Sequence, residues 1–360
     1  MKYGLWFSRI EGITAGKRRL LLEAAGSAEA VYGMPRQVLC KIKGLSETDV
    51  ERVIRSRESW DIEGRAYELM EHGISFVSIE QKQYPKNLRN IHNAPYGLYY
   101  RGNLPEEKKR SVGIVGSRRR SEYGRYLARE MGKELAENDI QVISGMALGI
   151  DTDGHTGALD GNGKTFAVLG CGVDVCYPRS NRWLYDRIIR SGGGILSEYP
   201  MGQAPIASQF PSRNRIISGL SDAVVIVEAR KKSGSLITAD FALEQGKDVY
   251  AVPGRITDSL SEGCNGLIAQ GAGIIGNISE FVHEQTNLTE KSYVQMDFRK
   301  IFLEKDESLV YSLLDFCPIS LGTLLEQAEL SLTDLLRILQ RLEDKGYAKE
   351  SVPNYFVRCL

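Results

Sequence analysis

Short apolar runs alternate with segments of helical periodicity through the middle of the chain, from about residue 65 to residue 285. The runs are apolar throughout, which is typical of strands covered on both faces in a parallel sheet flanked by helices. They span residues 112–115, 141–144, 165–169, 194–197, 223–227 and 248–252. The pattern predicts an α/β domain with an extended Rossmann-like, doubly wound parallel sheet, and residues 74–102 predict further strands on one side of it.

The first 64 residues have a helical pattern and a weak internal repeat. The sequences Ile10-Glu-Gly-Ile-Thr and Ile42-Lys-Gly-Leu-Ser each open an amphipathic stretch, and Ser46 with Asp49 forms a capping pattern. The repeat predicts a small N-terminal helical domain of the helix-hairpin-helix or SAM-like type. Neither hairpin is rich in Lys or Arg, so a phosphate-binding hairpin and a plain pair of helix-start turns remain equal alternatives.

The last part of the chain predicts a linker followed by a winged helix. Residues 286–305 are polar and weakly patterned, whereas residues 306–360 hold three helical periods and a short hairpin. The third helical period balances Arg and Lys against Asp and Glu, which favours a protein-binding or vestigial wing over a reader of duplex DNA. The predicted division is therefore 1–64, 65–285, linker 286–305 and 306–360.

Charge and composition narrow the class of protein. The 46 Lys and Arg residues balance the 46 Asp and Glu residues, so any binding to nucleic acid must come from a local patch. No run of about 20 apolar residues could span a bilayer, and the start of the chain lacks a signal-peptide pattern. The six cysteines form no Cys-x-x-Cys pair, which indicates reduced thiols and no metal site. We expect a soluble cytoplasmic protein.

Glycine, hydroxyl and basic residues gather directly after the predicted strands. In an open parallel sheet these loops meet at the carboxyl edge, where helix N-termini attract anions. The predicted phosphate pocket consists of Gly116, Ser117, Arg118, Ser144, Gly145, Ala147, Gly170, Ser233, Gly234 and Ser235. The loops contain neither Gly-x-Gly-x-x-Gly nor Gly-x-x-x-x-Gly-Lys-Ser/Thr, which argues against a dinucleotide oxidoreductase or a P-loop NTPase, and we expect no cofactor.

The segment Phe210-Pro-Ser-Arg-Asn-Arg carries a ring, two guanidinium groups and an amide at a helix start. Phe210, Arg213, Asn214 and Arg215 together suit a stacked base beside its phosphates. The structural alternative makes Phe210 a core residue and pairs the arginines with Glu198 or Glu228.

His155 follows Asp151 by four residues, as a general acid or a metal ligand could. No second histidine or carboxylate cluster accompanies it, which favours a hydrogen-bonded structural histidine. Ser233 and Ser235 have no assignable general base, so no catalytic residue is predicted.

These motifs together resemble the DNA-processing protein A (DprA, or Smf) family. The resemblance covers residues 84–275 and rests on Gly116-Ser-Arg, Ser144-Gly-Met-Ala-Leu-Gly-Ile-Asp, His155-Thr-Gly-Ala-Leu, Ser197-Glu-Tyr-Pro, Phe210-Pro-Ser-Arg-Asn-Arg, Ser233-Gly-Ser-Leu-Ile-Thr-Ala, Val252-Pro-Gly and Gly263-Cys-Asn-Gly-Leu-Ile. It implies a non-enzymatic, dimeric protein that binds and protects single-stranded DNA and loads the RecA recombinase during natural transformation and recombination.

The resemblance also implies roles for particular residues. Arg118 would hold a phosphate, Phe210 would stack on a base, and Arg213 and Arg215 would line the groove, with Lys247 reaching the same strand. One departure is Leu148, where many members of the family have Arg.

The apolar stretch after the last predicted strand predicts a symmetric dimer surface. Ile256, Leu260, Leu267 and Ile268 lie in it, and it holds more apolar residues than one short helix needs to cover the sheet end.

Two rival functions come from other classes. A nucleoside-monophosphate phosphoribohydrolase would need a glutamate in the turn after its phosphate loop, but after Ser233 none occurs before Glu244. A gene regulator would need the winged helix to bind duplex DNA, against its balanced charge.

Overall fold

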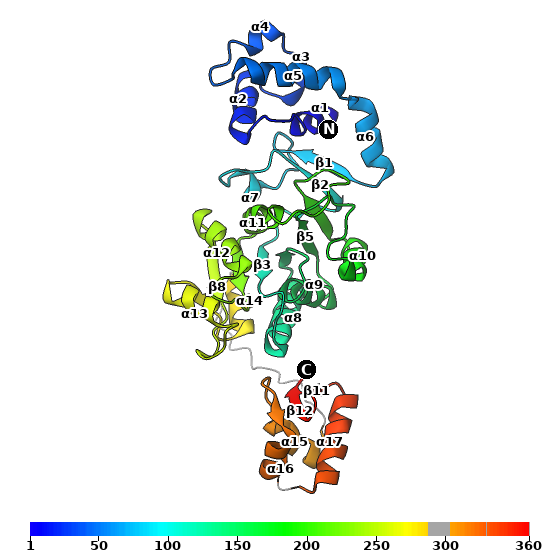
Figure 1. Cartoon of the computed structure of the whole chain (residues 1–360), viewed down its shortest axis with the longest axis vertical. Coiled ribbons are helices and arrows are strands. Elements are labelled where there is room, and N and C mark those ends of the chain that lie inside the picture. The colour runs from blue at the N-terminus through cyan, green and yellow to red at the C-terminus, as the bar shows by residue number, and fades with distance from the viewer. Residues whose placement is uncertain (287–302, 329, 360) are drawn as a thin grey trace.

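A nine-stranded sheet forms the centre of the computed structural model, which describes residues 1–286, 303–328 and 330–359 (Figure 1). The strands are β1 (Ser75–Ser78), β2 (Gly97–Gly102), β3 (Ser111–Val115), β4 (Gln141–Ser144), β5 (Thr165–Leu169), β6 (Gly194–Ser197), β7 (Ala223–Ile226), β8 (Asp248–Ala251) and β9 (Gly273–Ile274). Their order is β1-β2-β6-β5-β4-β3-β7-β8-β9. The predicted doubly wound fold is confirmed, including the added strands β1 and β2, which pair antiparallel to their neighbours.

Helices cover both faces of this sheet because its strands are apolar on both sides. The helices are α7 (Lys86–Arg89), α8 (Glu122–Glu137), α9 (Ile150–Asp160), α10 (Arg182–Arg190), α11 (Gln209–Leu220), α12 (Gly234–Glu244), α13 (Glu262–Ala269) and α14 (Ile278–Gln285), with a 3-10 turn η1 (Arg179–Asn181) before α10. Side chains of α8, α9 and α14 pack on one face with Ile114 and Val142, and those of α7, α11, α12 and α13 pack on the other face with Val115 and Ile143.

Six helices precede the sheet: α1 (Lys2–Ser8), α2 (Ala15–Ala25), α3 (Ala28–Gly33), α4 (Arg36–Leu39), α5 (Glu47–Ser59) and α6 (Ile62–Glu71). The predicted boundary at residue 64 falls inside α6, and the end of this helix packs through Leu69 on Ile74 and Phe76. We therefore propose to move the boundary to the end of α6.

The two hairpin repeats contact each other. Lys17 and Asp49, each five residues after its hairpin glycine, form an ion pair of 2.7 Å. Gly12 has a φ of +70°, and its carbonyl accepts a bond from Arg52 Nη1 of the other repeat. Thr14 and Ser46 cap the helices that follow. The hairpins therefore help to pack the two repeats together.

The C-terminal domain, residues 303–359, lies at the opposite end of the molecule from α1 (Figure 1). Its elements are α15 (Lys305–Leu313), β10 (Ile319–Ser320), α16 (Leu321–Ala328), α17 (Leu332–Asp344), β11 (Ala348–Val352) and β12 (Tyr355–Arg358). The three predicted helices and the terminal hairpin are thus present. Most of the predicted linker, residues 287–302, lies outside the described residues. Across the described ranges, no helix is both long and apolar enough to cross a bilayer.

Candidate nucleic-acid interface

A cavity of about 510 Å³ opens at the carboxyl edge of the sheet, where the loops after β3 and β7 separate. Between these two adjacent strands the chain changes its direction of progress across the sheet, and such switch points are where open α/β sheets bind ligands. We call this space the switch-point cavity. Its lining residues are Val115, Gly116, Ser117, Arg118, Ala147, Asp151, Tyr177, Ala207, Phe210, Pro211, Arg213, Asn214, Ile217, Arg230, Lys232, Ser233, Gly234, Ser235 and Thr238.

Backbone hydrogen bonds hold the loops of the cavity in place. Ser117 donates its N–H to the carbonyl of Glu228 at 2.8 Å, and its own carbonyl accepts from Ile150 at 3.2 Å. Gly149 has a φ of +79°, and a Cβ there would overlap the carbonyl oxygen of Ser117. The loop after β4 can therefore approach the loop after β3 only because residue 149 is glycine.

The end of the first loop is fixed by a buried carboxylate. Glu228 accepts bonds from the Ser121 hydroxyl at 2.5 Å and the Ser121 N–H at 2.9 Å, at the N-terminus of α8. Glu228 therefore does not pair with an arginine of α11, which was one structural alternative.

Three cations line the cavity without a carboxylate partner among the described residues: Arg118, Arg230 and Lys232. All three side chains are exposed. The loops therefore present free positive charge at the edge of the sheet, next to the N-terminus of α12, where backbone N–H groups also attract anions. Arg230 and Lys232 were absent from the predicted set, although they stand in the same sequence loop as Ser233.

Two aromatic rings stand beside these cations. Phe210, in the first turn of α11, is half-buried, and its ring centroid lies 5.4 Å from that of Tyr177. The guanidinium carbon of Arg118 lies 5.7 Å from the Phe210 ring. Tyr177 is 44% exposed and was missed in the sequence, because its position after the loop of Gly170 gives it no periodic pattern. The predicted core alternative does not hold for Phe210, because it lines the cavity.

Arg213 is buried and braces the cavity floor. It is 4% exposed, and its Nη1 donates to the carbonyls of Gly145, at 2.7 Å, and Val168. Burial lowers the pKa of Arg213 to about 10, and the nearby Asp151 carboxylate opposes that shift. Asp151 accepts from the N–H groups of Gly145 and Ala147 at 3.1 Å and 3.3 Å. Arg213 thus lines the cavity as predicted, but one of its two terminal nitrogens is engaged by the protein.

Arg215 does not line the cavity, and its predicted role is wrong. Its Nη2 donates to both carboxylate oxygens of Glu198, at 2.9 Å and 2.7 Å, because residue 215 points to the other side of α11 from the cavity. This is the structural alternative named above. Asn214 does line the cavity, with its amide nitrogen donating to the Gly234 carbonyl at 3.2 Å.

The predicted contact of Lys247 with the same DNA strand is also wrong. It precedes β8, which runs parallel to β7, so it lies at the amino edge of the sheet, opposite the cavity. Ser144 is buried and donates to the Ile114 carbonyl at 2.6 Å, and Gly170 lies beneath the Phe210 ring. With Gly145, these two residues support the cavity without lining it. The other predicted pocket residues come together.

His155 has the structural role favoured from the sequence. It is fully buried, its Nδ1 lies 2.6 Å from the Thr165 hydroxyl, and burial lowers its pKa to about 3. Thr165 itself donates to the Val142 carbonyl, so it accepts from Nδ1–H of a neutral ring.

One of the predicted dimer residues belongs to the core. Leu267 is buried with the residues of β7 and β8, because α13 turns this side chain toward the sheet. Ile256 is 91% exposed, while Leu260 and Ile268 are half-buried. The exposed apolar surface of this stretch thus excludes Leu267.

The fold and the cavity define a doubly wound α/β protein with a cavity lined by exposed cations at its switch point. The family model for the DNA recombination-mediator protein A matches residues 75–286, more than half of the chain. The chain belongs to this family, as its sequence motifs indicate.

Characterised relatives resemble the chain in sequence and structure. The DNA processing protein DprA of Streptococcus pneumoniae is 46% identical over 198 residues, 55% of this chain and 70% of that protein. Protein Smf of Escherichia coli is 35% identical over 289 residues, 78% and 76% of the two chains. The crystal structure of the pneumococcal protein matches with a TM-score of 0.68 at 35% identity, covering 79% of this chain and 98% of that one.

A second solved structure bears on the ligand of a relative. DprA of Helicobacter pylori, described with its single-stranded DNA binding mode, matches with a TM-score of 0.52 at 32% identity, over 59% of this chain and 94% of that one.

Proposed function

We propose that the switch-point cavity binds single-stranded DNA. The observation that carries this proposal is a group of three cations with no carboxylate partner in the described part of the chain, beside the rings of Phe210 and Tyr177. These cations are Arg118, Arg230 and Lys232. Cations bind phosphates of any sequence, and a ring can stack on a base only where the base face is free. A duplex keeps its base faces stacked, so the combination favours single strands. The single-stranded DNA binding of the H. pylori relative supports the same ligand.

The geometry suits adjoining parts of one strand. Because the Arg118 guanidinium lies 5.7 Å from the Phe210 ring, one phosphate and a neighbouring base can be held together. On the opposite wall, the hydroxyls of Ser233 and Ser235 lie 2.7 Å apart at the start of α12 and offer donors to a further phosphate. The strand would thus lie between the loop after β3 and the start of α12.

The binding is proposed to be non-enzymatic. Asp151 is the carboxylate among the residues that line the described cavity, and its Oδ2 already accepts two backbone N–H groups. A phosphoribohydrolase needs an acid beside the sugar. Glu244, the first glutamate after Ser233, ends α12 at the far edge of the sheet. Free base release from nucleotides should therefore not exceed that of a buffer blank.

We infer that the protein protects incoming DNA and helps to load RecA recombinase in the cytoplasm during recombination and natural transformation. Membership of a family of DNA recombination mediators supports this role. We further propose a homodimer that uses the exposed surface at Ile256, Leu260 and Ile268. In light scattering, Ile256→Glu should turn a dimeric protein into a monomer.

The test of the main proposal compares a single strand with a duplex of equal length by fluorescence anisotropy. The single strand should bind more tightly, without marked preference among sequences that form no secondary structure. Tighter binding to the duplex would overturn the proposal. Equal binding of the single strand and the duplex would mean that the rings do not contribute to binding, and would also overturn the proposal.

A further inference from the structure

The C-terminal domain contacts helix α8 through aromatic rings and the loop after β8 through an ion pair. Phe316 lies over α8, with its ring stacked on Tyr126 at 5.4 Å and 19° and tilted against Tyr123 at 5.6 Å. Beside it, Asp315 pairs with Arg255 of the loop after β8 at 2.9 Å. Asp315 also accepts the N–H of Phe316 at 2.7 Å, which fixes the turn that presents the ring.

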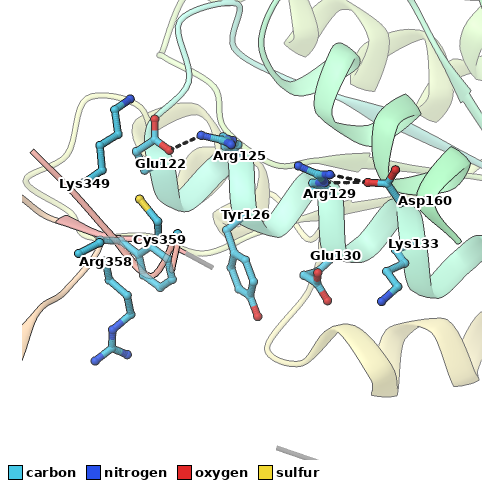
Figure 2. A pocket seen from close by; sticks show the side chains of 13 residues that line it. Glu122, Arg125, Tyr126, Arg129, Glu130, Lys133, Asp160, Lys349, Arg358 and Cys359 are labelled. Carbon is cyan, nitrogen blue, oxygen red and sulfur yellow. Dashed lines mark hydrogen bonds and ion pairs between the residues drawn. The ribbon is translucent and has the colours of Figure 1, made fainter. Parts of the chain in front are cut away.

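A cleft of about 540 Å³ lies beside this contact (Figure 2). We call it the α8 cleft; one wall is α8 and the other is the hairpin of β11 and β12. Its lining residues are Glu122, Arg125, Tyr126, Arg129, Glu130, Lys133, Asp160, Phe316, Gly346, Ala348, Lys349, Arg358 and Cys359. Five of these side chains are cations and three are carboxylates, so the lining has a net charge of 5 − 3 = +2.

The excess charge belongs to the hairpin wall. On α8, Arg125 pairs with Glu122 at 2.9 Å and Arg129 pairs with Asp160 at 2.6 Å. On the hairpin, Lys349 is exposed and pairs with no carboxylate of the described residues.

Arg358, the other cation of the hairpin, is held without a carboxylate. Its Nη2 donates to the Tyr311 carbonyl at 2.9 Å, its guanidinium lies 4.6 Å from the Tyr311 ring, and its Nε is buried with no hydrogen-bond partner. The hairpin wall therefore has two cations whose charge no carboxylate of the described residues neutralises.

The α8 cleft lies next to the switch-point cavity. Arg118 lines the cavity and Glu122 lines the cleft, and four residues separate them in the chain. Four residues span at most about 14 Å between Cα atoms, even when fully extended. A strand bound at Arg118 is therefore within reach of the N-terminus of α8 and of the cleft beside it.

We propose that the α8 cleft is a second binding site for the phosphate backbone of the same single strand. The Phe316 contact holds the C-terminal domain against α8 so that Lys349 faces the strand, while Arg358, held by the Tyr311 carbonyl, adds positive charge to the same wall. This inference rests on the proposed function of the switch-point cavity. It assigns the C-terminal domain a contact with DNA through its hairpin wall instead of through α17.

The test uses the full chain with short and long oligothymidylates, of about 6 and about 30 nucleotides, because only the long strand can reach both sites. Lys349→Ala should leave binding of the short strand unchanged. For the long strand it should lower the affinity and reduce the slope of log K against log salt by about 0.7, the value for one lost phosphate contact.

A second variant tests the docking contact, and a matched variant controls for charge. Phe316→Ala should reduce the long-strand slope by more than Lys349→Ala does, since it frees the whole hairpin from α8. Phe316 lies outside the core cluster of the C-terminal domain, so this variant should fold, which its melting curve checks. Arg337→Ala removes an exposed cation of α17 outside the cleft and should change neither strand's binding.

Unchanged long-strand binding in both Lys349→Ala and Phe316→Ala would overturn this inference. Tighter long-strand binding by Phe316→Ala would also overturn this inference, because the C-terminal domain would then block the DNA strand instead of binding it. Failure of the proposed function is distinguishable, because the short strand would then not bind the unaltered protein.

Discussion

The loop after β3 and the start of α11 are both rich in arginine, but they use it differently. In the loop, Arg118 is exposed and has no carboxylate partner among the described residues. In the helix, Arg213 donates to backbone carbonyls and Arg215 donates to Glu198. The difference shows that an arginine near a ligand site is available to a phosphate only when the protein itself does not use its donors.

The largest expected effect comes from replacing an arginine of α11, and it is a loss of protein stability. Arg213→Ala should lower the free energy of unfolding by about 3 to 5 kcal/mol, because it leaves two buried carbonyls without their donor and removes the positive charge near the buried Asp151 carboxylate. Thermal unfolding should shift by roughly 10 °C. A variant of normal stability that has lost DNA binding would instead make Arg213 a direct contact.

The ring at the start of α11 should matter for binding and not for salt dependence. Phe210→Ala should weaken single-strand binding by about 1 to 3 kcal/mol, since one stacked base is lost, and should leave the salt slope nearly unchanged. Tyr177→Ala should act in the same direction. If Phe210→Ala melts far below the unaltered protein and its folded fraction binds normally, the ring is a core residue.

His155 is a second buried group that stabilises the protein and does not line the cavity. Its ring is neutral, although it lies near the charged Arg213. Its pKa lies near 3 in the folded protein and near 6.5 when unfolded, so the unfolded state takes up the proton first. The stability that the neutral ring provides is therefore complete above pH 6.5 and is lost as the pH falls toward 3, by about 1.4 kcal/mol per pH unit.

Urea unfolding at several pH values checks this expectation for His155. His155→Asn keeps a donor for Thr165 and removes the titrating ring, so its stability should fall less steeply below pH 6.5. The same pH dependence in both proteins would place the titration elsewhere.

Most of the fold follows from the apolar runs. The six predicted runs correspond to β3 to β8, and the three C-terminal helical periods correspond to α15, α16 and α17. The strand β9 was missed because two residues, Gly273 and Ile274, hold too little pattern to predict it.

The loops of the candidate site could be predicted from the sequence, but the pairing of its side chains could not. Lys247 could have been excluded from the sequence, because a residue before a parallel strand lies at the amino edge. The pairing of Arg215 with Glu198 could only be named as an alternative, because it depends on how α11 is rotated over the sheet. Tyr177 needed the structure, since only the fold places it against Phe210.

The variant with the smallest expected effect gives the most direct test of the central claim. The claim is that loop cations with no carboxylate partner among the described residues bind the DNA strand, whereas the arginines of α11 stabilise the protein itself. Single-strand binding is measured at several salt concentrations for Arg118→Ala, for its neighbour Arg119→Ala, which lies outside the cavity lining, and for Arg215→Ala. Arg118→Ala should reduce the slope of log K against log salt by about 0.7, and the other two variants should keep the slope of the unaltered protein. An unchanged slope in Arg118→Ala, or an equal reduction in Arg215→Ala, would contradict the claim.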